Sequence, residues 1–144
     1  MLTSFSALTL DETVAQGEFV FTRDSLVRYA GASLDFNPIH YRDDFARSVG
    51  LPGVLAHGML TMGAAASVVT DLLGAGVEVA EYQVKFTKPV PVDAEQGAKI
   101  AVDAVVAKLD EEAQTARIDL KVRFGELTVL GRSQLTLRFR KHEK

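Results

Sequence analysis

Apolar and polar residues alternate with a period of two along much of the chain after residue 77. The alternation is clearest where Ile118, Leu120 and Val122 are separated by charged residues. Such a pattern is typical of strands that bury one face and leave the other in water. Turn residues separate four such segments, so we predict an antiparallel meander of four consecutive strands. Their ranges are about residues 81–87, 99–104, 117–124 and 135–140, and a short strand is also expected over residues 17–21.

Residues 57–73 follow a different pattern, because they are apolar or small on every side of a helix. The segment contains one certain charge, Asp71, and Gly74 and Gly76 mark its end. A helix of this kind is expected to be buried on all sides. Its roughly 16 residues would extend about 24 Å, which is short for a membrane span. A curved antiparallel sheet wrapped around this helix satisfies both patterns. We therefore predict an α+β fold in which residues 1–144 form a single domain.

A third segment, Ser33 to His40, cannot be regular structure. Pro38 has no N–H to donate, and it disfavours helical geometry at Asn37. A pinned loop could aim the carboxylate of Asp35 and the imidazole of His40 at one point. On these residues alone, an ordinary surface turn explains the Asp, Asn and Pro equally well. Short helices are expected on either side of the loop, over residues 23–29, where Gly31 would end the first, and over residues 43–48.

The composition limits the classes of function. The chain has 144 residues, of which 47% are hydrophobic and 24% are charged, as is usual for a globular protein. It has no cysteine, which excludes disulfides and thiolate catalysis, and its three histidines show no metal-ligand spacing. We therefore predict neither a metal nor a cofactor. The net charge of −3 gives no case for a nucleic-acid or membrane partner. The N-terminus does not resemble a signal peptide, so a cytoplasmic location is expected.

Three motifs, in order along the chain, resemble one known family. They are Asp35-Phe36-Asn37-Pro38-Ile39-His40 followed by Ala46, then Ala56-His57-Gly58-Met59-Leu60, and then Tyr82-Gln83-Val84-Lys85-Phe86-Thr87-Lys88-Pro89-Val90. They resemble the MaoC-like (R)-specific hydratases and dehydratases. Within that family, the similarity is greatest to the HadB-type catalytic subunit of actinobacterial (3R)-hydroxyacyl-ACP dehydratases. The resemblance covers about residues 5 to 140.

The resemblance implies a hotdog fold and a reaction in fatty-acid metabolism, with chain elongation as the expected role. Family members add water to trans-2-enoyl thioesters or remove it from (3R)-3-hydroxyacyl thioesters carried by acyl carrier protein or CoA. By resemblance, Asp35 and His40 form the catalytic pair and Asn37 is the supporting amide. The backbone N–H of Gly58, at the start of the apolar helix, would be the oxyanion donor. Dimerisation is expected because a single curved sheet leaves an exposed edge strand. A homodimer and a heterodimer with a second hotdog subunit both fit.

One residue departs from the family pattern, and it keeps alternatives open. The family usually has glycine before the catalytic aspartate, where this chain has Leu34. If that position takes a positive φ, leucine is strained there. The departure favours an alternative in which the chain is an acyl-thioester-binding or structural subunit of a heterodimeric dehydratase, without chemistry of its own. A hotdog thioesterase would need a carboxylate at the central helix, which offers Asp71 alone. His57 is interpreted as structural, either as a helix cap or as a pocket residue.

Overall fold

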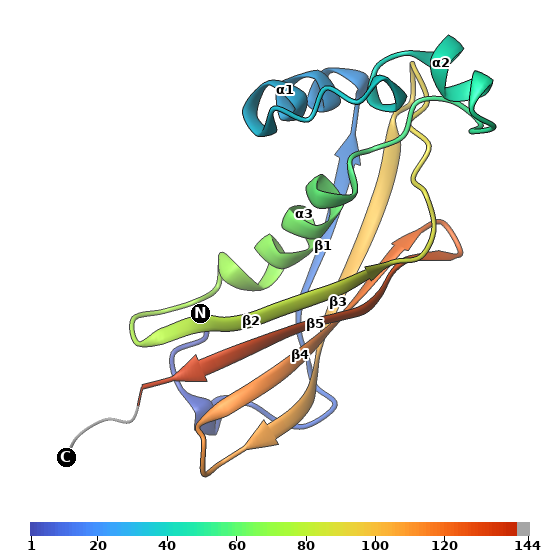
Figure 1. Cartoon of the computed structure of the whole chain (residues 1–144). Coiled ribbons are helices and arrows are strands. Elements are labelled where there is room, and N and C mark those ends of the chain that lie inside the picture. The colour runs from blue at the N-terminus through green and yellow to red at the C-terminus, as the bar shows by residue number, and fades with distance from the viewer. Residues whose placement is uncertain (141–144) are drawn as a thin grey trace.

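The computed structural model describes residues 1–140, and a five-stranded antiparallel sheet forms its largest part (Figure 1). The strand order across the sheet is β1-β3-β4-β5-β2. The strand predicted over residues 17–21 begins earlier, at Thr13. The strands are β1 (Thr13–Phe21), β2 (Val77–Phe86), β3 (Ala98–Asp110), β4 (Thr115–Phe124) and β5 (Leu127–Phe139).

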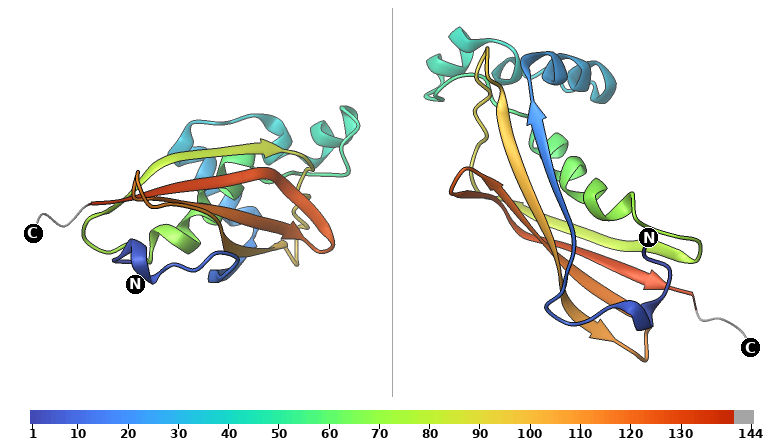
Figure 2. Two further views of the ribbon diagram at one scale, coloured as in Figure 1. Left: turned by 90° about the horizontal axis from the view of Figure 1, so that it is seen from below. Right: turned by 180° about the vertical axis from the view of Figure 1, so that it is seen from behind.

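The predicted four-strand meander is wrong in one strand. Strands β3, β4 and β5 are joined by short turns and pair in sequence order, but β2 pairs with β5 at the far edge. Tyr82 of β2 lies opposite Leu135 of β5. Alternation identifies strands with one buried face and says nothing about which strands are neighbours. The connection over residues 87–97 is long enough to cross the sheet, as the views in Figure 2 show.

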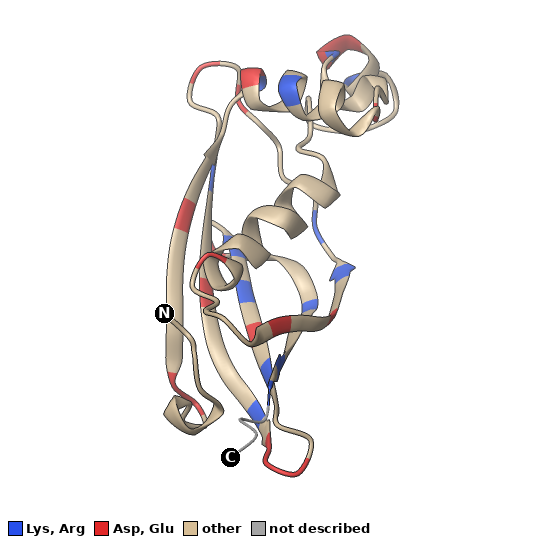
Figure 3. Cartoon of the chain, turned by 90° about the vertical axis from the view of Figure 1, so that its left-hand side faces the viewer, with Lys and Arg blue, Asp and Glu red and all other residues tan. Residues whose placement is uncertain are grey.

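Helix α3 (Gly58–Thr70) lies across the concave face of the sheet (Figure 1). Thr61, Ala65 and Val69 are buried, and their spacing of four residues forms one stripe that faces the sheet. No residue of α3 is charged (Figure 3). The prediction of burial on all sides is nevertheless wrong for this chain, because Gly63 is exposed and Met59 is 57% exposed. Within residues 1–140, no helix is long and apolar enough to cross a membrane.

Two shorter helices, α1 (Arg23–Ser33) and α2 (Asp43–Ser48), lie together at one end of the sheet (Figure 1). A capping box starts α1, in which Thr22 accepts from the backbone N–H of Ser25 and the Ser25 side chain accepts from that of Thr22. The helix continues past Gly31, so the predicted stop there is wrong. It ends at Leu34, whose backbone is left-handed. Single-turn 3₁₀ helices cover Phe5–Ala7 (η1) and Pro38–His40 (η2).

Candidate active site

The loop between α1 and α2 carries the first two candidate residues. The carboxylate Oδ1 of Asp35 accepts from the backbone N–H of Asn37 at 3.1 Å, and the side chain of Asn37 accepts from that of Ile39 at 3.2 Å. These are two successive Asx turns, the second of which caps η2. The turn chemistry considered from the sequence is therefore present, and it holds a carboxylate that is half exposed. Asn37 shapes the loop through its side-chain oxygen.

Just before the loop, Leu34 has φ 62° and ψ 18°. This is the left-handed region, in which a side chain other than that of glycine, asparagine or aspartate is uncommon. Its N–H donates to the carbonyl oxygen of Ala30, which closes helix α1. The side chain is 76% exposed, so no packing compensates for the backbone conformation. The position therefore favours glycine.

His40 closes the loop and is buried. Its Nδ1 lies 2.7 Å from the carbonyl oxygen of Leu55. A carbonyl oxygen can only accept, so Nδ1 carries the proton in the neutral ring and Nε2 keeps its lone pair. That Nε2 lies 3.9 Å from Oδ2 of Asp35. The structure therefore brings the two predicted side chains together, with a gap that a substrate oxygen could bridge.

His57 lies beneath this pair and immediately precedes α3. It is 1% exposed, and its ring stacks on that of His40, with centroids 3.8 Å apart and planes 22° apart. Its Nε2 donates to the backbone carbonyl oxygen of Asp35 at 3.2 Å. Burial lowers the pKa of His57, and nearby His40 lowers it further, against an opposing effect of Asp35. His57 is the N-cap residue of α3 by position, but its side chain makes no capping hydrogen bond.

Gly58 is the first residue of α3, and within residues 1–140 its N–H has no hydrogen-bond acceptor. The first N–H groups of a helix are unpaired and lie at the positive end of its dipole. A Cβ at this position would lie 2.9 Å from the ring of Phe86. Gly58 and Phe86 line a pocket of about 320 Å³, together with Ala56, Thr61, Thr87, Lys88, Pro89, Val90, Val129 and Leu130. Neither Asp35 nor His40 lines it.

Asp35, His40 and His57 each offer a possible metal-ligand atom, and these atoms lie within 4.8 Å of one another. The two rings are nearly parallel, so the lone pairs of their in-plane nitrogens do not converge on one ion. Nδ1 of His40 and Nε2 of His57 already donate to carbonyl oxygens. This donor geometry suits a hydrogen-bonded cluster better than a tetrahedral metal site.

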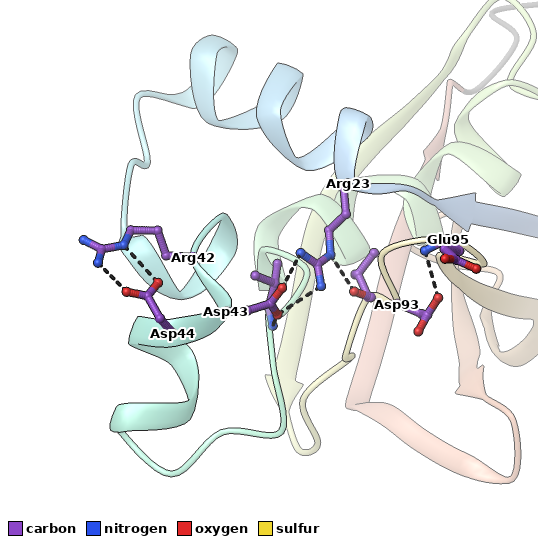
Figure 4. A network of polar contacts seen from close by, with 8 residues as sticks. Arg23, Arg42, Asp43, Asp44, Asp93 and Glu95 are labelled. Atoms are coloured by element: carbon purple, nitrogen blue, oxygen red, sulfur yellow. Dashed lines mark hydrogen bonds and ion pairs between the residues drawn. The ribbon is translucent and has the colours of Figure 1, made fainter.

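An ion pair ties together the segments that surround the loop (Figure 4). Arg23, the first residue of α1, donates from Nη1 and Nη2 to both carboxylate oxygens of Asp43 at 3.0 and 3.1 Å. Its Nε donates to the carbonyl oxygen of Val92 at 2.7 Å, and the N–H of Val54 donates to Asp43 at 3.0 Å. The Arg23 hydrogen bonds and the Val54 N–H hold the pKa of Asp43 below its usual value. This ion pair joins the start of α1 to the start of α2, the helix that follows the loop.

Residues 6–123 match the family described as MaoC like domain. The chain belongs to this family. A 3-hydroxyacyl-thioester dehydratase X of Mycobacterium tuberculosis is 39% identical over 74 residues, which cover 51% of this chain and 25% of that protein. An (R)-specific enoyl-CoA hydratase of Rhodospirillum rubrum is 34% identical over 79 residues, which cover 54% of this chain and 55% of that protein. The matched part of the chain thus spans about a quarter of the length of the first relative and about half of the length of the second.

Solved structures of the family confirm the hotdog fold predicted for this chain. A MaoC-like dehydratase superposes with a TM-score of 0.89 at 31% identity, covering 96% of this chain and 42% of that one. The HadBC (3R)-hydroxyacyl-ACP dehydratase complex of Mycobacterium tuberculosis superposes with a TM-score of 0.65 at 17% identity, covering 84% and 90%. At that identity the second likeness concerns the fold alone.

Sequence reasoning named Asp35, Asn37, His40 and Gly58, and it assigned no function to the rings around them. Phe86 was missed as a neighbour of the site, whereas His57 was interpreted as structural, either as a helix cap or as a pocket residue. The sequence places His57 directly before Gly58, so a site at the start of the helix must also have His57 nearby. Asp71, the carboxylate that a thioesterase would need, is at the C-cap of α3, at the opposite end of the helix.

Proposed function

We propose that the chain is a hydro-lyase acting on acyl thioesters in fatty-acid metabolism, with chain elongation as its role. It adds water to trans-2-enoyl thioesters and, in reverse, removes water from (3R)-3-hydroxyacyl thioesters. CoA or acyl carrier protein carries the acyl group, and the expected location remains the cytoplasm. The observation that carries the proposal is the approach of Asp35 to His40 beside the start of α3, where the Gly58 N–H has no acceptor among residues 1–140.

In the dehydration direction, three events must be coupled. One member of the Asp35–His40 pair takes the proton from C2, and the C3–O bond breaks. The departing hydroxyl takes a proton from the other member and leaves as water. Nε2 of His40 and a carboxyl oxygen of Asp35 face the gap between them. Before dehydration one of these two atoms holds the proton that the hydroxyl takes, and the other is the base that accepts the C2 proton, so the pair ends with as many protons as it began with. Because a coupled pair shares its protons, we assign the roles of general base and general acid to the pair as a whole and not to either residue alone.

The thioester oxygen gains negative charge while the C2 proton leaves. The Gly58 N–H supports this charge in the proposal, because it is an unpaired donor at the positive end of a helix. Phe86 covers Gly58, but 51% of it is exposed, so it has room to turn aside. Asn37 holds the loop in the turn that presents Asp35. Neither Gly58 nor Asn37 needs to exchange a proton in the reaction.

Hydration of crotonyl-CoA, followed by loss of the conjugated thioester absorbance, tests this proposal. Asp35→Asn and His40→Asn should each lower kcat/KM by about 10² to 10⁴. Asparagine at position 40 can still donate to the Leu55 carbonyl oxygen, so the loop stays anchored. Asp44→Asn is the matched control, since Asp44 is exposed and pairs with Arg42 in solvent. Unchanged turnover in both site variants would exclude the assigned roles.

The proposal also includes a second hotdog subunit, so that the chain works as a dimer with another copy of itself or with a related chain. Two features support it. Helix α3 leaves Met59 exposed, and the edge strand β2 leaves Val79 exposed. Pairing two sheets side by side would cover such an edge. Native mass spectrometry of the same preparation that is assayed shows which oligomeric state is active.

The alternative is a subunit that binds acyl thioesters, or supports a catalytic partner, without chemistry of its own. The strained backbone of Leu34 next to Asp35 favours it. Activity of the purified chain alone would exclude this alternative. Activity that appears only with a partner chain, and that survives Asp35→Asn in this one, would establish it.

A further inference from the structure

We propose that His57 is a positioning residue that holds Asp35 and His40 in their reactive arrangement. This inference rests on the proposed function. The two contacts of His57 reach both members of the pair from one ring. Its Nε2–H donates to the backbone carbonyl oxygen of Asp35 at 3.2 Å, and its face lies against His40 with centroids 3.8 Å apart.

The stack supplies a constraint that the other contact of His40 lacks. The hydrogen bond from His40 Nδ1 to the Leu55 carbonyl oxygen holds one edge of the ring, but small changes of the side-chain torsions still let the ring tilt. A flat ring against the face of His40 opposes that tilt and so sets the direction of Nε2. Tyr29 packs against His57 with centroids 4.8 Å apart, so the lower ring is itself held in place.

The buried Nδ1 of His57 supports a functional reason for this residue. Within residues 1–140 this atom has no hydrogen-bond partner. A buried polar atom without a partner is unfavourable, and an apolar ring would avoid it. What an apolar ring cannot do is donate to the Asp35 carbonyl oxygen. Histidine therefore combines a flat face with one donor, and its unpaired nitrogen is the consequence.

His57 must also stay neutral in this role. Within residues 1–140, the titratable groups beside it are His40 and Tyr29, whose rings contact it, and Asp35, whose charge acts on it. A proton on His57 would place a positive charge against the ring of His40 and oppose protonation of that ring during turnover. Burial lowers the pKa of His57, in agreement with a neutral ring.

Two variants separate the flat face from the donor. His57→Phe keeps a ring and removes the donor, while His57→Gln keeps an N–H that can reach Asp35 and removes the ring. We expect kcat to fall about 10- to 100-fold in His57→Phe with KM nearly unchanged, because small displacements of reacting groups have effects of this size. Thermal stability should stay near the wild-type value, because removal of the unpaired nitrogen offsets the lost hydrogen bond to the Asp35 carbonyl oxygen. His57→Gln should recover part of the lost kcat.

The control is Val69→Ala, which opens a cavity in the buried stripe near the far end of α3. It should lower the melting temperature and keep kcat. Wild-type kcat in His57→Phe, or losses of kcat that simply follow melting temperature across the three variants, would overturn the inference. If His57→Phe does not fold, His57→Leu takes its place, and kcat equal to that of His57→Gln would then overturn the role of the donor.

Nitrogen-15 NMR of the imidazoles separates this inference from the proposed function, because it needs no turnover. We expect opposite tautomers, with the proton on Nδ1 in His40 and on Nε2 in His57. In His57→Phe, the His40 signals should broaden or shift toward a mixture of tautomers. A wild type that is inactive both alone and with a second hotdog subunit, but that shows these tautomers, would refute the proposed function and leave the positioning of His40 by His57 intact. An unchanged His40 spectrum in His57→Phe would refute the positioning, whatever the activity.

Discussion

Replacing Gly58 by proline would remove the proposed oxyanion donor and leave the start of α3 otherwise intact. Gly58 is the first residue of the helix, where proline is well tolerated because the N–H has no intrahelical partner. The preceding residue, His57, has φ −60° and ψ 129°, which is the extended geometry that a residue before proline prefers. The helix should therefore form in Gly58→Pro, and the variant should lose one N–H.

The magnitude follows from the chemistry of that donor. Removal of one oxyanion-hole donor typically lowers kcat by about 10² to 10³, or about 2.7–4 kcal/mol of transition-state stabilisation. The donor acts when charge develops on the thioester oxygen, so kcat should fall much more than KM rises. The assay is hydration of crotonyl-CoA, with circular dichroism and melting temperature measured on the same preparation.

Gly58→Ala is the matched control, because it adds a Cβ and keeps the N–H. In both variants the Cβ would come within about 2.9 Å of the Phe86 ring. That ring is half exposed and can move, so we expect alanine to lower kcat by less than about 10-fold. A proline variant that folds and is as active as the alanine variant would refute the role of this N–H.

Two further predictions concern stability. Leu34→Gly should raise the free energy of unfolding by about 0.5–1 kcal/mol in urea denaturation, because glycine accepts φ 62° and the exposed leucine packs on little; a lower stability would show that leucine is not strained. Asp43→Asn should lower it by about 1–2 kcal/mol at pH 7, because charge-assisted hydrogen bonds from Arg23 are weakened. The folded-state pKa of Asp43 is depressed, so this difference should be full above about pH 4 and shrink as pH falls through the folded pKa; a pH-independent difference would contradict the ion pair.

Much of the site could be predicted from the sequence because its parts lie close together along the chain. Asp35, Asn37 and His40 fall within six residues, and Pro38 excludes a regular helix or strand there. Local turn chemistry then decides most of the loop, and the structure shows two successive Asx turns in it. Gly58 was named as the oxyanion donor by resemblance to the family, and its place at the start of an apolar helix agrees with the residues themselves.

The rest depends on contacts between residues far apart in the sequence. His40 and His57 are 17 positions apart, and their stack exists because the loop folds back over the start of α3. Phe86 comes over Gly58 because its strand lies at the edge of the sheet beside β5. No local pattern specifies either contact.

The sequence by itself determined which chemical groups this protein has in one loop, which segments are strands with one wet face, and which helix is apolar. These properties follow from residue type and periodicity, which act over a few neighbouring positions. Tertiary structure alone decided that β2 pairs with β5, that one stripe of α3 faces the sheet, and that His57 lies beneath His40. The physical reason is that strand order and ring stacking depend on how distant segments share one hydrophobic core, and periodicity carries no information about partners.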